Sequence, residues 1–369
     1  MAKIYYRLYQ IDRIGQLYDE SFCLRNLYPD DEIAFIVPEI SEKVNNYSLQ
    51  ECFKGKKIYK TNETQFLNET HRVNFTEELI NFEDGYLYSK KPKYLTTKFR
   101  NKFRNQKALY YHDSISINNQ TIEKFKEDLK INLNDKIVTL HIREKGYLSG
   151  LNYHSYRNMD FKCLNKLIYY LIDSGFTIVR LGDPTMKDSN IFHDKFIDLT
   201  KTKYYNTFAE SLIISNSILF IGTISGPFSI AQTKSIPILA INQERPFTEW
   251  GSYLDFDLPR NYYSKKLKRN LTFSEIIFSK LYGFYDTEEY ANNDILLIQN
   301  NQDEILISCQ EMLHNISLKN KNFNNVPILK YYENLFNYSQ ENRNSSLMQY
   351  KNIPNNFINK NNNYFGHLI

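Results

Sequence analysis

The chain has 369 residues and a net charge of +4, and 42% of its residues are apolar. This length exceeds the usual size of one hydrophobic core, so we expect two domains, and the apolar content excludes global disorder. The mild positive charge argues against a dedicated nucleic-acid-binding protein, and the four widely spaced cysteines predict neither a zinc site nor a disulfide framework.

The first forty residues read as a strand, a helix and a second strand. Residues 3–10 are rich in β-formers, residues 14–28 place apolar side chains on one helical stripe, and residues 31–37 are mostly apolar. This βαβ order predicts a parallel sheet. The residues that follow show one clear element, a helix at 122–130, and we expect residues 1–130 to form an N-terminal Rossmann-like domain.

From residue 136 onward the pattern is sharper, because continuous apolar strands alternate with amphipathic helices. The predicted strands lie at 136–142, 176–182, 195–200, 217–222 and 236–242, and the predicted helices at 160–175, 204–216, 227–235 and 301–316. This alternation predicts a doubly wound parallel sheet in a second Rossmann-like domain at 131–315. The motif DFD at 255–257 is expected after the last core strand, and the Asn-rich residues 316–369 are expected to form a tail or a return segment. The predicted fold class is α/β, with two Rossmann-like domains that face a cleft.

Polar side chains follow the predicted strands at their carboxyl ends, where ligands bind in open α/β sheets. His141 and Arg143 share one face of a strand end, and an arginine there makes charge-assisted bonds to a diphosphate. Arg157 and Asn158 precede a helix N-terminus, which favours anions. The alternative interpretations are a buried histidine with satisfied hydrogen bonds, a surface arginine and a plain capping loop.

Two further clusters follow later strands. Asp183 stands where a carboxylate accepts from a ribose hydroxyl or a base N–H, although turn formation explains an aspartate there equally well. The segment FIGTISGPFSIAQ at 220–232 turns from a strand into a helix on small and hydroxylated residues, so it is a candidate phosphate cradle. Its candidate contacts are Thr223, Ser225, Gly226 and Ser229.

In order and spacing, the patterns H-I-R-x-x-x-Y, H-S-Y-R-N, R-L-G-D and F-I-G-T-x-S-G-P resemble a family of bacterial glycosyltransferases associated with surface-polysaccharide loci. The resemblance covers about residues 135–315. More distantly, H-I-R with G-T-x-S-x-x-S is similar to the donor domain of protein O-fucosyltransferases and α1,6-fucosyltransferases. That resemblance implies a GT-B fold without a catalytic metal, in which residues 1–130 bind the acceptor and residues 131–315 bind the nucleotide-sugar donor. It also implies that Arg143 and the 223–229 loop contact the donor phosphates and that Asp183 lies near the base or ribose. The residues after Arg143 depart from the fucosyltransferase motif, so the donor need not be GDP-fucose.

An inverting sugar transfer needs a base for the acceptor hydroxyl. The candidates are Glu144, His154 and, across the cleft, Asp12 in the loop after the first strand, for which a helix N-cap is the alternative interpretation. Arg143 and the helix N-terminus at Pro227 are expected to stabilise the departing nucleotide diphosphate, so neither a cofactor nor Mg²⁺ is required. The DFD motif has the letters of a metal-binding motif, but its expected position argues against that role.

The leading hypothesis is a metal-independent glycosyltransferase that acts on a bacterial surface glycan or a lipid-linked saccharide. The alternatives are a GT-B-like sugar-nucleotide 2-epimerase or hydrolase, and a non-catalytic module that binds nucleotide sugars. The N-terminus lacks an apolar signal-peptide core and no run of 18 apolar residues occurs, so a cytoplasmic protein is expected. The short basic run at 264–269 allows peripheral contact with the anionic inner membrane.

Overall fold

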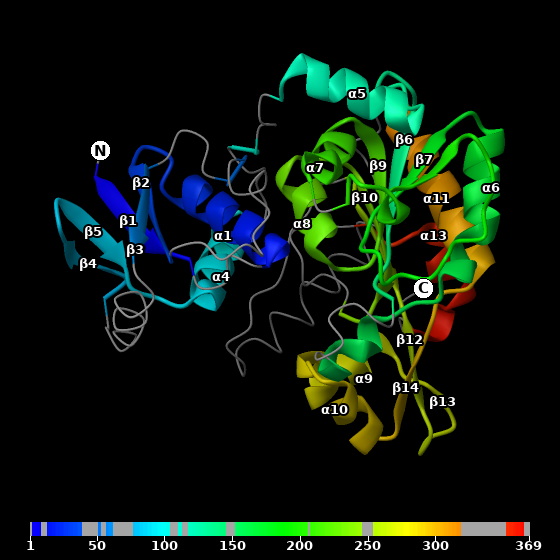
Figure 1. Ribbon diagram of the computed structural model, residues 1–369. Helices are drawn as coiled ribbons and strands as arrows, with labels where there is room; N and C mark the ends of the chain where they lie inside the picture. Colours follow the sequence, from blue (N-terminus) through cyan, green and yellow to red (C-terminus); the bar gives the residue numbers. More distant parts are fainter. Residues whose placement is uncertain are drawn as a thin grey trace.

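The computed structural model describes residues 2–8, 13–38, 51–52, 57–61, 77–103, 110–112, 117–144, 152–205, 207–245, 254–318 and 352–364. Two sheets built mainly from parallel strands carry helices against them, and a small antiparallel sheet lies below the larger one (Figure 1). This arrangement confirms the predicted α/β fold class.

The N-terminal sheet is drawn in blue and cyan in Figure 1. In the order in which they pair, its strands are β3 (Lys57–Thr61), β2 (Glu32–Pro38), β1 (Lys3–Arg7), β5 (Gly85–Tyr88) and β4 (Leu79–Phe82). All neighbours are parallel except β5 and β4. The apolar stripe of α1 (Ile14–Leu27) buries Leu17 and Phe22 in the core, where α4 (Pro92–Lys102) also packs.

The second sheet has six strands, and all neighbouring strands are parallel. In pairing order they are β8 (Phe196–Asp198), β7 (Thr177–Arg180), β6 (Ile137–His141), β9 (Ser217–Gly222), β10 (Ile238–Gln243) and β11 (Phe256–Pro259). Its helices are α5 (Asn119–Leu129), α6 (Asn165–Asp173), α7 (Phe208–Ser215), α8 (Gly226–Thr233) and α11 (Gln302–Ser317). The chain order reverses between β6 and β9, so the switch point at which such sheets bind ligands lies at the carboxyl ends of these two strands.

The prediction that the DFD motif lies beyond the last core strand is wrong. β11 begins within the motif, at Phe256, and extends the sheet beyond β10. Asp255 Oδ1 accepts a hydrogen bond from Ile238 N at 2.9 Å, and Asp257 is buried within the strand. A four-residue edge strand that contains an acid carries little apolar signal, which is why the sequence pattern did not predict it.

Short elements, held by contacts between distant parts of the chain, form in segments predicted as loops and at the ends of longer predicted elements. These elements are η1 (Asn152–Arg157), η2 (Phe161–Leu164), η3 (Leu199–Lys201), β12 (Asn261–Ser264), β13 (Arg269–Asn270), α9 (Phe273–Phe278), η4 (Lys280–Gly283), α10 (Thr287–Asn292) and β14 (Ile295–Ile298). β12 pairs antiparallel with both β13 and β14. Thr287 Oγ1 holds η1 in place, since it accepts from Tyr156 N at 3.1 Å and donates to Tyr153 O at 2.9 Å.

The two sheets are joined where α1 packs against α8 (Figure 1). A Cβ atom on Gly15 would lie 3.2 Å from the Cα of Gly226, so the two helices touch through their backbones. Ser229 Oγ on α8 donates to Asp19 Oδ2 on α1 at 3.2 Å. The N-terminal end of α8 therefore faces the N-terminal half of the chain.

Part of the Asn-rich C-terminal segment returns to the second sheet. Asn352 N donates to Asp255 O at 2.9 Å, and Asp257 N donates to Asn352 O at 2.8 Å. α13 (Asn355–Lys360) then packs against α11, and η5 (Asn362–Tyr364) follows it. In the part of the chain that is described, no helix has the length and apolar character needed to cross a membrane.

Candidate functional site

The ends of β6 and β9 are linked by hydrogen bonds at the switch point. His141 lies opposite Gly222 in the parallel register. Thr223 N donates to His141 O at 3.1 Å, and Thr223 Oγ1 accepts from Arg143 N at 3.0 Å. Three predicted site residues, His141, Arg143 and Thr223, are thus held together, with Thr223 fixing the backbone from which Arg143 projects.

His141 is a buried, neutral group at this point. Only 7% of the residue is exposed, and burial, followed by the charges of Arg180 and Arg143, lowers the pKa of His141 to about 3. Its buried Nδ1 has no hydrogen-bond partner among the described residues. A neutral imidazole offers one donor and one acceptor, so His141 can bind a polar ligand atom without adding charge.

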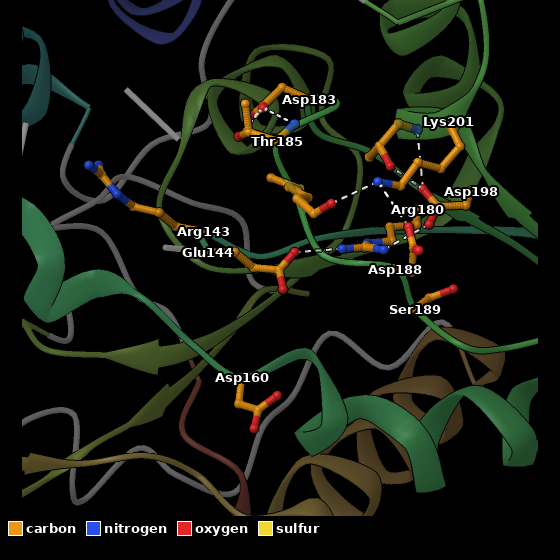
Figure 2. Close-up of polar contacts among 12 residues, drawn as sticks. Arg143, Glu144, Asp160, Arg180, Asp183, Thr185, Asp188, Ser189, Asp198 and Lys201 are labelled. Carbon is orange, nitrogen blue, oxygen red and sulfur yellow. Dashed lines mark hydrogen bonds and ion pairs between the residues drawn. The ribbon is translucent and has the colours of Figure 1, made fainter. Parts of the chain in front are cut away.

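Glu144 points away from Arg143 and toward Arg180 (Figure 2). Its Oε2 accepts from Arg180 Nη2 at 2.5 Å, and Asp198 Oδ2 accepts from Arg180 Nη1 at 2.7 Å. Arg180 is 1% exposed, so the two carboxylates compensate a buried charge that would otherwise be costly. The carboxylate of Glu144, one of the three predicted bases, is an ion-pair partner in this structure.

The 3₁₀-helix η1 brings His154 and Arg157 beside Tyr285, which lies between η4 and α10. The ring centroids of His154 and Tyr285 are 4.8 Å apart in an edge-on contact. The guanidinium carbons of Arg157 and Arg245 lie 5.3 and 5.2 Å from the Tyr285 ring centroid. Tyr285 is about half exposed, so two cations from different elements flank one accessible aromatic side chain.

Four arginines gather around His154 and Tyr285. We refer to Arg13, Arg143, Arg157 and Arg245 as the arginine cluster; they precede α1, follow β6, end η1 and follow β10, respectively. Burial, together with the charges of Arg157, Arg143 and Arg13, lowers the pKa of His154 to about 4. Charges shift a pKa in this way only when they are near, so arginines from both halves of the chain converge on His154. Glu244 Oε1 lies 3.4 Å from Arg157 Nε and offsets part of this charge.

Two predicted residues present buried oxygen atoms at the same edge of the sheet. Asp183 Oδ1 accepts from Thr185 N at 2.8 Å, which is the turn interaction that the sequence allowed (Figure 2). Asp183 Oδ2 and Asn158 Oδ1 are buried and have no hydrogen-bond partner among the described residues. Each is an acceptor that a ligand hydroxyl or N–H group can satisfy.

The remaining predicted cradle residues lie at the start of α8, where they contact α1 or cap the helix. Ser225 Oγ accepts from Phe228 N at 3.4 Å, and Ser229 Oγ donates to Asp19. A Cβ on Gly226 would lie 2.4 Å from Cγ2 of Ile14, so close helix packing also accounts for this glycine. Asp12 lies outside the residues that the structure describes.

Sequence reasoning missed Arg13, Arg245 and Tyr285. Arg245 follows a strand at its carboxyl end, so the rule that selected Arg143 and Asp183 could also have selected it. Arg13 and Tyr285 have no such signal, because they reach the site only through the packing of α1 and of the segment between η4 and α10.

No group of three or more His, Cys, Asp or Glu side chains is placed to hold a metal ion within the described ranges. The two acids of the DFD motif belong to the sheet. Asp255 accepts a hydrogen bond from Ile238 N, and Asp257 lies within β11.

No protein-family model matches the chain, and no curated protein sequence matches it. Among solved structures, a glycosyl transferase family 9 protein from Veillonella parvula is 11% identical, with 70% of this chain and 85% of that chain covered and a TM-score of 0.41. The ADP-heptose LPS heptosyltransferase II of E. coli is 9% identical, covers 65% of this chain and 84% of its own, and has a TM-score of 0.40. A second E. coli heptosyltransferase, solved with ADP-2-deoxy-2-fluoro heptose, is 10% identical over 68% of this chain and 91% of its own, with a TM-score of 0.38. At these values the likeness assigns neither an activity nor a substrate.

Proposed function

We propose that this chain is a GT-B glycosyltransferase that moves a sugar from a nucleotide-sugar donor to a saccharide acceptor. The observation that carries the proposal is the arginine cluster at the switch point of a doubly wound sheet. Open α/β sheets bind ligands at this position, and arginines bind phosphate oxygens through charge-assisted hydrogen bonds. A nucleoside diphosphate matches both the position and the charge.

In this proposal the donor contacts charged and polar groups at the carboxyl ends of the strands. Arg143 and Arg157 bind the diphosphate, and His141 hydrogen-bonds to it or to the sugar. The buried oxygens Asn158 Oδ1 and Asp183 Oδ2 accept from ribose hydroxyls or from the base, which would supply the donors that the described residues do not. Satisfying a buried acceptor in this way favours binding, since an unpaired one costs about 1–3 kcal/mol.

The base in this proposal is His154. Its Nδ1 is buried without a hydrogen-bond partner in the described part of the chain, and its lowered pKa keeps the ring neutral at pH 7. His154 accepts the proton of the acceptor hydroxyl while that oxygen attacks the anomeric carbon and the bond to the diphosphate breaks. A bound diphosphate offsets the arginine charges and thereby raises the pKa of His154 when the donor is present.

The arginine cluster stabilises the negative charge that develops on the leaving nucleotide diphosphate, so this step does not require Mg²⁺. The acceptor we propose is a bacterial surface glycan or a lipid-linked saccharide. Lys265, Lys266 and Lys268 are exposed in the turn between β12 and β13, and their charge would attract an anionic membrane that carries such an acceptor.

A thermal-shift screen with UDP, GDP, CMP and dTDP sugars tests the proposal. A ligand present at 100 times its Kd stabilises the folded chain by about 2.7 kcal/mol, so at least one donor is expected to raise the Tm clearly. Unchanged Tm values with every nucleotide sugar would overturn the proposal.

A second assay, with the donor that binds, distinguishes a glycosyltransferase from the two alternative functions. Release of the nucleotide together with an interconverted or free sugar, with no acceptor present, would identify an epimerase or a hydrolase. Binding without turnover in the presence of cell-envelope glycan acceptors would identify a non-catalytic module.

A further inference from the structure

A cavity of about 560 Å³ lies apart from the arginine cluster, between the three-stranded sheet and the C-terminal helices α13 and η5. Residues of β12, of β13 and of the two positions after β13 form one wall, and residues 359–361, 363 and 364 form the other. The volume lies within the range of about 300–1,000 Å³ that small-molecule sites occupy.

Asparagine side chains dominate the lining of this cavity. Asn261, Asn270, Asn359, Asn361 and Asn363 all contribute. Asn261 Nδ2 donates to Asn361 Oδ1 at 3.2 Å and ties the two walls together, whereas Asn261 Oδ1 is buried with no hydrogen-bond partner among the described residues. Each amide offers donors and an acceptor side by side, which is the pattern that pairs with neighbouring sugar hydroxyls.

The arginine of the cavity lining is paired within the protein. Arg269 makes two contacts to Glu275, at 2.6 and 2.9 Å. Lys360 lies close enough to Asp303 to help Lys166 lower the pKa of that carboxyl. The groups that remain in the majority are neutral amides, which suit an uncharged ligand that both donates and accepts hydrogen bonds.

The aromatic side chain at the cavity does not offer a stacking surface. Tyr364 is 3% exposed, and its ring packs against Phe273 and Phe357 at centroid distances of 5.7 and 5.5 Å. A nucleobase is usually held by stacking as well as by hydrogen bonds, whereas hydroxyl groups need only the polar lining. This difference favours a saccharide over a nucleotide.

The geometry points to a second ligand site: we propose that this cavity binds an uncharged oligosaccharide. Asn261 directly follows Arg260, whose Nη1 donates to Tyr156 O in η1 at 2.5 Å. The cavity wall is therefore adjacent in sequence to the residue that supports η1, the element that carries His154 and Arg157. A saccharide chain held here would stay near the arginine cluster while remaining outside it.

Saturation-transfer NMR on the full chain tests this proposal with maltotriose, chitotriose and trigalacturonate as probes. We expect transfer to at least one of the two uncharged trisaccharides and weaker transfer to the charged one. The double variant Asn270→Ala/Asn363→Ala removes two exposed lining amides and is expected to weaken binding about tenfold. The control Asn119→Ala/Asn134→Ala removes two exposed amides elsewhere and leaves binding unchanged, as does Arg143→Ala at the arginine cluster.

Absence of transfer to both uncharged trisaccharides would overturn the proposal, as would undiminished binding by the cavity variant. Loss of binding in Arg143→Ala would assign the saccharide to the arginine cluster instead. Tighter binding of trigalacturonate than of either uncharged probe would contradict the inferred ligand class.

Discussion

Arg143 and Glu144 are adjacent in sequence, yet their side chains belong to different networks. Glu144 compensates buried Arg180 inside the protein, whereas Arg143 extends the other way (Figure 2). This follows from alternation at a strand end, where successive side chains point to opposite sides. Of the two neighbours, only Arg143 therefore belongs to the arginine cluster.

Replacement of Arg143 tests whether this residue belongs to the ligand site. We expect Arg143→Ala to weaken nucleotide-sugar binding by about tenfold or more, since a charge-assisted hydrogen bond contributes about 1.5–3 kcal/mol. Lys266→Ala removes the same charge from an exposed turn and is expected to leave the Kd unchanged. Equal Kd values for the wild type and Arg143→Ala in a calorimetric titration would remove Arg143 from the site.

Burial of neutral His141 predicts a stability that depends on pH. Because the folded-state pKa, about 3, lies below the usual value of 6.5, the unfolded chain binds a proton first as the pH falls. The His141 contribution is complete above pH 6.5 and is lost by about 1.4 kcal/mol per pH unit below it. Urea unfolding at pH 7 and pH 5 measures this loss.

His141→Gln is expected to show a smaller loss of unfolding free energy between pH 7 and pH 5 than the wild type. Replacement of exposed His314 by Gln serves as the control and should keep the wild-type dependence. A wild-type slope in His141→Gln would contradict the account of this residue.

At the scale of elements, the approach of β9 to β6 depends on a residue without a side chain. A Cβ on Gly222 would lie 2.1 Å from His141 O, a backbone atom that cannot move without breaking the pairing. We expect Gly222→Ala to destabilise the fold by about 1–3 kcal/mol, as overpacking does, and to weaken nucleotide binding because Thr223 shifts.

Gly283→Ala is the matched control, because a Cβ at that position meets nothing within 4 Å. It is expected to be neutral or slightly stabilising, since alanine restricts the unfolded chain. Chemical denaturation of both variants measures the difference, and equal stabilities would show that the β6–β9 contact tolerates a side chain.

The sequence predicts elements well where burial is continuous. β6, β7 and β10 are buried along their whole length, and their runs of apolar residues predicted these strands. β11 and the three-stranded sheet were not predicted. Their strands are short, contain polar side chains and are stabilised by neighbours distant in sequence. For the same reason His141 and Arg143 were found from a strand end, whereas Tyr285 reaches the site through packing that no local pattern encodes.

At the scale of the whole molecule, a buried ion pair joins the two halves of the chain. Lys234 is the residue directly after α8, and its Nζ lies 3.1 Å from Glu51 Oε1. Both side chains are at most 3% exposed. Glu51 also accepts hydrogen bonds from Ser211 on α7 and from Tyr18 on α1. The pair therefore connects the N-terminal half to two helices of the second sheet.

Removal of one charge from this pair leaves the other buried and uncompensated. We expect Lys234→Met to lower the free energy of unfolding by about 3–5 kcal/mol, and the double variant Glu51→Gln/Lys234→Met to recover part of that loss. Lys126→Met, which breaks an exposed pair with Glu123, should cost less than about 1 kcal/mol. Similar losses in Lys234→Met and Lys126→Met, measured by urea unfolding, would show that the buried pair does not hold the halves together.

The central claim is that the arginine cluster binds the diphosphate of a nucleotide-sugar donor. Calorimetric titration of the full chain with UDP, GDP, ADP and dTDP, each beside its nucleoside, tests it most directly. The account predicts that at least one nucleoside diphosphate binds, that its nucleoside binds at least about tenfold more weakly, and that Arg157→Ala removes most of this difference. Binding of no diphosphate, or equal affinity for a diphosphate and its nucleoside, would contradict it.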